Sequence, residues 1–154
     1  MAGTSMEMKK KSCRASILRN QFAVVAVSLL LQLHATELGA QLITTFAGDG
    51  EEGFSGDGGP ATSAKLHPGE WPGHFRVAVA ANGDVYIVDG GNHRIRKVTR
   101  SNGTISTVVG TGSAGFTGDG GQATSAQLNA PSNIALDSVG DLFVLDKDNE
   151  RVRK

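Results

Sequence analysis

The polar residues with the most regular spacing are an aspartate, an asparagine and an arginine that occur twice, 57 positions apart: Asp89, Asn92 and Arg94, then Asp146, Asn149 and Arg151. They could form a ligand-binding surface. Alternatively, the Asp and Asn side chains bond turn amides and each Arg pairs with a carboxylate across the hairpin. A catalytic site needs a residue once, whereas these recur in every copy. We therefore interpret the six residues as a structural motif and predict no catalytic residues.

Two further carboxylates, Asp57 and Asp119, lie in glycine-rich loops 62 positions apart. Because glycine frees the backbone to approach a ligand or a cation, both are candidate binding residues. Asp49, Glu51 and Glu52 add oxygens of the kind that calcium prefers, although their spacing matches no known calcium loop. Adjacent hydroxyl residues could equally cap local turns. We assign no metal site and no cofactor, with calcium as the alternative.

The remaining candidates do not recur in the second copy. His67, His74 and His93 lack the paired spacing of a zinc site, and we expect His93 at an exposed strand start. Trp71 and Phe75 form the single aromatic cluster, next to two prolines. That cluster is either a recognition patch, which makes both residues candidate binding residues, or ordinary packing, or the product of a splice or assembly error in the sequence.

These residues belong to a longer internal repeat. Gly53–Leu66 returns as Gly115–Leu128 with an offset of 62, and Gly83–Asp89 returns as Gly140–Asp146 with an offset of 57. The first copy thus holds about five extra residues between the two segments. Self-similarity of this length indicates one supersecondary unit that is stacked on its neighbour.

Each unit contains short apolar stretches separated by tight turns. We predict strands at 42–47, 76–80, 85–88, 94–98, 105–109, 133–137, 142–145 and 151–153. Asn82-Gly83 and Asn102-Gly103 are hairpin turns, and residues 85–88 are apolar on both faces, as in a strand buried on two sides. Residues 61–66 form one helical turn or an extended segment. Such strands pair as an antiparallel meander of four per unit, which favours a β-propeller blade over a solenoid coil.

The pattern Gly-Asp-Val-Tyr-Ile-Val-Asp followed by Asn92, Arg94 and Lys97-Val98 resembles the NHL repeat, and residues 140–154 match it again. The glycine-rich loops resemble those of a secreted, often bacterial, subgroup. The resemblance implies an all-β fold: antiparallel four-stranded blades of an NHL-type β-propeller. Phe54 and Phe116 are expected in the core between blades.

Family propellers usually close with about six blades, whereas this sequence holds about two. Two blades leave open strand edges and lack the neighbours that bury their faces. We therefore expect a fragment of an incomplete propeller. The chain as it stands is expected to fold marginally or to self-associate through its open blade edges.

The first 40 residues read as a signal peptide. A basic stretch, residues 9–19, precedes the apolar run Phe22–Leu33, which is too short to span a membrane and fits a secretory signal. Cleavage is expected after Ala40 or Ala35, with a retained anchor helix as the alternative. Residues 41–154 then form the partial propeller, in repeat units of about 42–104 and 105–154, and the protein is secreted or periplasmic with no membrane contact after cleavage.

The net charge and the cysteine content limit the kinds of partner and of chemistry that we expect. After residue 40 the chain carries about three net negative charges, which gives no electrostatic reason to bind nucleic acid. Its single cysteine, Cys13, lies in the leader, so the repeats contain no disulfide. We expect a binding or interaction scaffold that presents loops to a protein or carbohydrate and performs no catalysis. The resemblance also implies an alternative: part of a peptidyl-hydroxyglycine lyase-like or lactonase-like propeller enzyme whose catalytic residues lie in missing blades.

Overall fold

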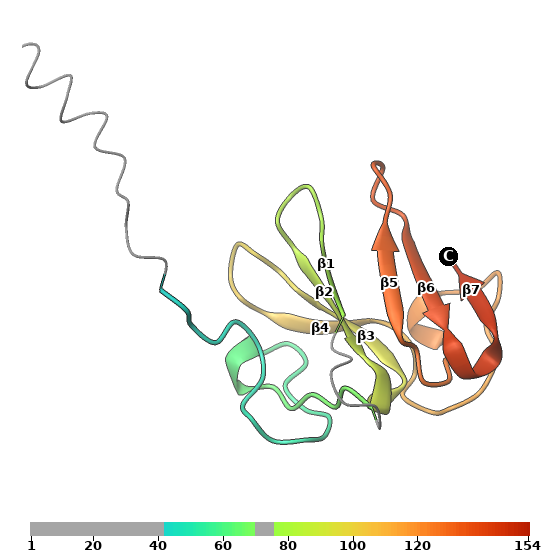
Figure 1. Cartoon of the computed structure of the whole chain (residues 1–154), viewed down its shortest axis with the longest axis horizontal. Coiled ribbons are helices and arrows are strands. Elements are labelled where there is room, and N and C mark those ends of the chain that lie inside the picture. The colour runs from blue at the N-terminus through green and yellow to red at the C-terminus, as the bar shows by residue number, and fades with distance from the viewer. Residues whose placement is uncertain (1–41, 70–75) are drawn as a thin grey trace, which may run out of the picture. The chain divides into compact units, whose positions relative to one another are not determined.

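In the residues that the computed structural model describes, 42–69 and 76–154, seven short strands form two antiparallel sheets (Figure 1). The first sheet has the order β1-β2-β3-β4: Val77–Val79, Val85–Asp89, Arg94–Val98 and Ile105–Val109. The second has the order β5-β6-β7: Asn133–Leu136, Leu142–Asp146 and Arg151–Arg153. Both sheets belong to one compact unit, residues 44–154. The all-β antiparallel prediction is confirmed.

Asparagine-glycine pairs make the hairpin turns of the first sheet, as predicted. Asn82 Oδ1 accepts the N–H of Asp84 at 3.0 Å, and Gly83 takes a φ of 85°. Asn102 and Gly103 repeat this arrangement before β4, with a φ of 68° at the glycine. Positive φ costs glycine little, so these pairs set the register in which Val98 lies opposite Ile105.

Four single 3₁₀ turns complete the described elements: η1 (Ala61–Ser63), η2 (Gly90–Asn92), η3 (Ala123–Ser125) and η4 (Lys147–Asn149). The turns η1 and η3 end the two glycine-rich loops, which resolves the alternative left open for residues 61–66. The turns η2 and η4 connect the second and third strands of each sheet. Each of these two is followed by a left-handed residue at φ 54°, His93 and Glu150. No helix of the described residues is long and apolar enough to cross a membrane.

The strand predicted at 42–47 is not formed, so that prediction is wrong. Its counterpart in the repeat is β4, which exists because it pairs with β3. The same offset of 62 puts the counterpart of β3 at residues 32–36. These residues lie outside the described part of the chain. A strand is stable only against a partner.

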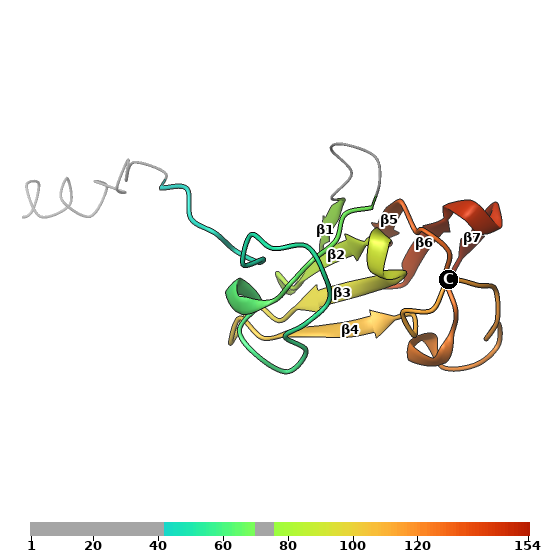
Figure 2. The same ribbon diagram turned by 90° about the horizontal axis from the view of Figure 1, so that it is seen from below.

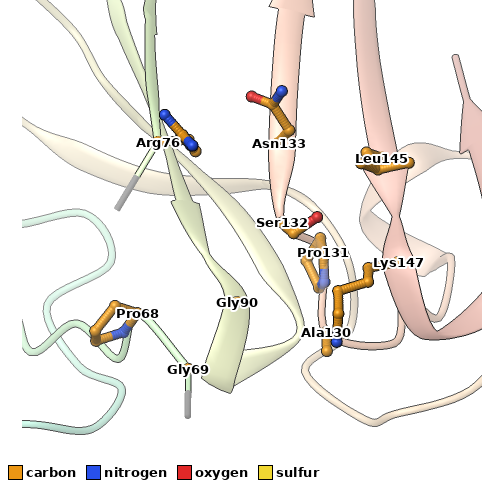
Figure 3. A pocket seen from close by; sticks show the side chains of 10 residues that line it. All are labelled: Pro68, Gly69, Arg76, Gly90, Ala130, Pro131, Ser132, Asn133, Leu145 and Lys147. Atoms are coloured by element: carbon orange, nitrogen blue, oxygen red, sulfur yellow. The ribbon is translucent and has the colours of Figure 1, made fainter. Parts of the chain in front are cut away.

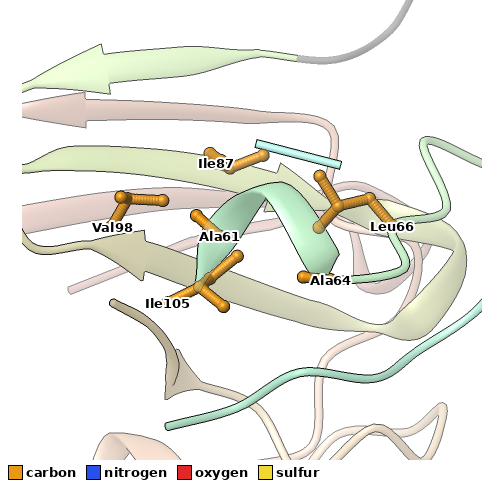
Figure 4. Packing of buried hydrophobic residues seen from close by; sticks show 6 residues of the cluster. All are labelled: Ala61, Ala64, Leu66, Ile87, Val98 and Ile105. Atoms are coloured by element: carbon orange, nitrogen blue, oxygen red, sulfur yellow. The ribbon is translucent and has the colours of Figure 1, made fainter. Parts of the chain in front are cut away.

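Two apolar clusters lie on opposite faces of the first sheet. On one face the η1 loop covers the sheet and buries Ala61, Ala64, Leu66, Ile87, Val98 and Ile105 (Figure 4). On the other face, Val88 and Ile95 pack against Leu128, Ile134 and Val144 of the second repeat. Ile87 and its neighbour Val88 therefore point to different clusters, which confirms that β2 is buried on two sides. The first strands of the two sheets, β1 and β5, lie next to each other (Figure 2).

Candidate functional site

Asp89 and Asn92 tie the first glycine-rich loop to the sheet that follows it. Asp89, at the end of β2, is fully buried, and its Oδ1 accepts the backbone N–H of His67 at 2.8 Å and Asn92 Nδ2 at 2.7 Å. The Asn92 amide also donates to the carbonyl of Gly53 at 2.7 Å. Burial raises the pKa of Asp89, although the bonds from His67, Asn92 and Arg96 act in the opposite direction.

Arg96 of β3 is the centre of this network and has no exposed surface. Its Nε and Nη2 donate to Asp57 Oδ1 at 3.0 and 2.7 Å, Nη2 also to the carbonyl of Ser55 at 3.0 Å, and Nη1 to Asp89 at 3.3 Å. Thr107 of β4 donates to the other oxygen of Asp57 at 2.7 Å. We call Asp57, Asp89, Asn92 and Arg96 the first loop clamp. A charge this deeply buried requires such partners, and here they come from loop and sheet together.

The second repeat has a corresponding network, formed by Asp119, Asp146, Asn149 and Arg153. We call these four residues the second loop clamp. Arg153 donates to Asp119 at 2.6 and 3.0 Å and to the carbonyl of Thr117 at 2.8 Å. Asn149 again bridges the aspartate and a loop carbonyl, that of Gly115. The second loop clamp is more open: the Asp119 side chain is 66% exposed and that of Asp57 37%.

The loop glycines allow the loop backbone to approach its own returning segment. Gly56 and Gly118 have φ values of 87° and 90°, and a Cβ on them would lie 2.8 and 2.7 Å from the Cα atoms of Ala64 and Ala126. No side chain fits there. The Gly-Asp-Gly-Gly motif is therefore explained by close backbone packing and by an aspartate that bonds an arginine.

The predicted partners of the motif arginines need correction. Arg94 and Arg151 form no ion pair in the described residues; they lie over Phe54 and Phe116, 3.7 and 4.0 Å from the ring centroids. The arginines that pair with carboxylates stand two positions later in each copy, on the same face of the strand. These two, Arg96 and Arg153, also recur with the offset of 57, which was the signal that sequence reasoning missed.

The expectation that Phe54 and Phe116 lie in the core between blades is wrong. Their exposed fractions are 41% and 40%. Each ring lies beneath two guanidinium groups, because alternate arginines of β3 and β7 flank it. Cation–π stacking with these arginines therefore accounts for the recurrence of the two phenylalanines.

The candidate binding residues divide into two groups. Asp57 and Asp119 are both engaged by an arginine, whereas Trp71, Phe75 and His74 lie outside the described residues. Within 42–69 and 76–154, no group of three or more His, Cys, Asp or Glu side chains is placed to hold a metal ion. Ligand binding by these aspartates and the calcium alternative stay predictions.

Sequence reasoning missed a pocket of about 360 Å³ between the two sheets, here called the interblade pocket (Figure 3). It is lined by Pro68, Gly69, Arg76, Gly90, Ala130, Pro131, Ser132, Asn133, Leu145 and Lys147. Arg76 and Asn133 occupy equivalent positions of the repeat, as do Gly90 and Lys147. The pocket thus gathers positions at which the two copies differ. That difference was the available signal, but nothing in the sequence placed these positions together.

Two contacts fix the shape of the interblade pocket. A Cβ on Gly90 would lie 2.7 Å from the carbonyl oxygen of Pro131 and 3.0 Å from that of Pro68, so glycine is required where the two loops meet. His93, half-buried beside η2, accepts the N–H of Ala130 on its Nδ1 at 3.0 Å. This bond joins the first sheet to the loop before β5. The expected exposed location of His93 is therefore corrected.

Comparison with known proteins agrees with this arrangement. A profile of the NHL repeat matches residues 76–98. Half of the chain is 38% identical over 77 residues to Protein SUPPRESSOR OF QUENCHING 1, chloroplastic, of Arabidopsis thaliana, and 40% identical over 90 residues to Teneurin-4 of Homo sapiens. The chain spans 7% and 3% of the lengths of these relatives.

Two crystal structures from Bacteroides thetaiotaomicron share the fold. An auxiliary nutrient binding protein is 23% identical with a TM-score of 0.54, covering 75% of this chain and 29% of that one. A structural genomics protein of unknown function is 25% identical with a TM-score of 0.51, covering 60% and 22%.

Two successive antiparallel meanders, packed face on face with their first strands side by side, are blades of the β-propeller class. The matched repeat makes the assignment specific for the first of them: residues 76–98, which contain β1, β2 and β3, carry an NHL repeat. We refer to β1–β4 as the first blade and to β5–β7 as the second.

Proposed function

We propose that this chain is a secreted binding scaffold that holds a protein or carbohydrate ligand at the interblade pocket and performs no reaction. The observation that carries the proposal is the division of polar residues into two sets. The recurring residues Asp57, Asp89, Asn92 and Arg96, with their counterparts in the second copy, are engaged in the two loop clamps. Those that differ between the copies line the interblade pocket, as expected where a repeated frame presents a specific surface.

The lining favours an anionic group next to an apolar face. Arg76 and Lys147 supply positive charge from the two blades, and Asn133 and Ser132 supply amide and hydroxyl groups. Prolines and Leu145 form the apolar walls. Arginine recognises a carboxylate with two parallel hydrogen bonds. An acidic sugar, or an acidic side chain of a protein, fits this combination.

Preorganisation supports binding. The backbone N–H of Gly91 donates to the carbonyl of His67 at 2.9 Å, and His67 in turn is held by Asp89 of the first loop clamp. The loop that carries Pro68 is thus bonded to η2 before a ligand arrives. A wall that is already ordered loses little entropy on binding.

The experiment uses arrays of acidic and neutral glycans and of acidic peptides as probes. Wild type is compared with Arg76→Ala, Lys147→Ala and the control Lys65→Ala, a basic residue outside the interblade pocket. For probes that wild type binds, we expect at least a roughly tenfold loss with Arg76→Ala, since a charged hydrogen bond contributes about 1.5–3 kcal/mol. Undiminished binding by both pocket variants would refute the site. Release of a chemically altered probe would refute the absence of catalysis.

Export is the second part of the proposal and is supported by the basic stretch and apolar run of the leader. Mass spectrometry of the protein recovered outside the producing cell should find Gln41, or Thr36, at the amino terminus. Recovery of the full-length chain in the cell membrane would favour a retained anchor instead.

A further inference from the structure

The two asparagine-glycine turns of the first sheet differ in the residue that follows. Asn82-Gly83 precedes Asp84, whereas Asn102-Gly103 precedes Thr104. The second turn thereby forms the pattern of asparagine, any residue but proline, then threonine or serine, to which an oligosaccharide is attached in secreted proteins. This pattern occurs once in the chain. A hairpin turn requires the asparagine and the glycine, but not the threonine.

The side-chain amide nitrogen of Asn102 is free. In the other turn both amide atoms of Asn82 are engaged: Oδ1 accepts the N–H of Asp84 at 3.0 Å, and Nδ2 donates to its carboxylate at 3.1 Å. Asn102 repeats the first of these bonds, because its Oδ1 accepts the N–H of Thr104 at 3.0 Å. Its Nδ2 has no partner within residues 42–69 and 76–154. Since the sugar is joined to this nitrogen, Asn102 presents the required acceptor.

The tip of this turn has room for a large group. Ser101, Asn102 and Gly103 are all exposed. A Cβ on Gly103 would meet no atom of the described residues within 4 Å, whereas one on Gly83 would collide with the Arg100 side chain. An oligosaccharide is bulky and hydrated, so it requires an open surface position of this kind.

Main-chain bonds hold the turn in place on the folded surface. The N–H of Gly103 donates to the Thr99 carbonyl at 2.8 Å, and the N–H of Thr99 donates to the carbonyl of Thr104 at 2.9 Å. From the first glycine-rich loop, the N–H of Ala61 donates to the Gly103 carbonyl at 2.9 Å. Since these bonds involve no side chain, they remain when Asn102 or Thr104 is replaced.

We propose that Asn102 is an N-glycosylation site of this chain, and the proposal rests on the export proposed above. Asn102 Nδ2 forms a bond to the anomeric carbon of a polyprenyl diphosphate-linked oligosaccharide. The bond between that carbon and the diphosphate oxygen breaks, and the polyprenyl diphosphate leaves with the electron pair. The amide loses one proton to a base of the oligosaccharyl transferase, which recognises the hydroxyl of Thr104.

A glycan on Asn102 leaves the interblade pocket open. Gly90 of η2, which lines the pocket, precedes β3, and Asn102 lies in the turn that follows β3. The two positions thus lie at opposite ends of the first sheet (Figure 1). The five residues of β3 separate them by roughly 17 Å. The glycosylated end and the proposed binding end are therefore distinct, and a ligand should bind equally well with and without the glycan.

Cell-free translation of the full chain with endoplasmic-reticulum microsomes tests the site. On gels, wild type should shift by one oligosaccharide, and peptide N-glycosidase should remove the shift. Asn102→Gln and Thr104→Ala should abolish the shift, whereas Thr104→Ser, which keeps a hydroxyl, should retain it. The matched control is Asn82→Gln, which alters the other asparagine-glycine turn and should leave the shift unchanged.

Protease protection separates this proposal from export. A chain that is protected inside the microsomes but not shifted overturns glycosylation of Asn102 and leaves export standing, as does a shift that Asn102→Gln retains. A chain that stays accessible to protease contradicts both, since the transferase acts in the lumen. Digestion by the N-glycosidase in water enriched in heavy oxygen labels each asparagine that carried a glycan. Mass spectrometry should find the label at position 102, and its absence there overturns the proposal.

Discussion

Replacement of Arg96 by methionine tests whether the loop clamp stabilises the fold. The methionine fills part of the volume but removes the charge from a site with no exposed surface. Asp89, equally buried, then loses its ionic partner, and the Ser55 carbonyl loses a donor. Leaving one member of a buried ion pair without its partner costs about 3–5 kcal/mol, which is a large share of the stability of a domain of this size.

The second loop clamp provides a matched comparison. Arg153 makes the corresponding bonds to Asp119, Asp146 and the Thr117 carbonyl, and a further one to the Gln127 carbonyl, but its main partner Asp119 is largely exposed, so water replaces part of what Arg153→Met removes. We expect about 1–2 kcal/mol there, from the lost hydrogen bonds. Urea unfolding followed by circular dichroism measures both changes, and the melting temperature should fall by more than roughly 10 °C for Arg96→Met. If Arg153→Met lowers the free energy of unfolding as much as Arg96→Met or more, the conclusion that burial makes the first loop clamp the stronger of the two is wrong.

Two further predictions follow from the same contacts. Gly90→Ala forces a methyl group against the carbonyl oxygens of Pro131 and Pro68. We expect this substitution to lower the free energy of unfolding in urea by about 1–3 kcal/mol and to speed proteolysis of the loop before β5. Unchanged cleavage would show that the two loops do not meet at Gly90. The pKa of Asp84 is lowered chiefly by the N–H of Arg100, and that of Asp137 chiefly by the N–H of Asp141. Since their folded pKa values lie below the ordinary 3.8, the stability they contribute is present above it and is lost as the pH falls through the folded values. Asp84→Asn should make the acid-induced loss of stability less steep, and an unchanged slope would exclude this contribution.

Much of the fold could be predicted because the internal repeat shows which segments form equivalent strands and turns. Asn82-Gly83 and Asn102-Gly103 specify their turns by local chemistry, and the strands between them follow from apolar patterning. Residues 42–47 show the limit. Their sequence is that of β4, but a strand requires a partner that the pattern itself does not name.

The candidate site was less accessible from the sequence. Recurrence identified Asp89 and Asn92 as structural, but it could not tell which arginine of the Arg94–Arg96 pair faces the aspartate. Both side chains lie on the same face of β3, so the choice depends on how far along the strand the loop places Asp57. The interblade pocket is formed by residues up to 79 positions apart, Pro68 to Lys147, and its lining depends on how two blades pack.

The most direct test of the central claim, that the recurring polar residues hold the loops rather than bind a ligand, is amide hydrogen exchange on wild type and Asp57→Asn. The substitution removes the charge that Arg96 and Thr107 bond, so the account predicts faster exchange at the Gly58, Ala61 and Ile105 amides. The Gly115 and Ala126 amides of the second loop should keep their protection. Unchanged exchange throughout the first loop would contradict the account, because Asp57 would then hold nothing in place.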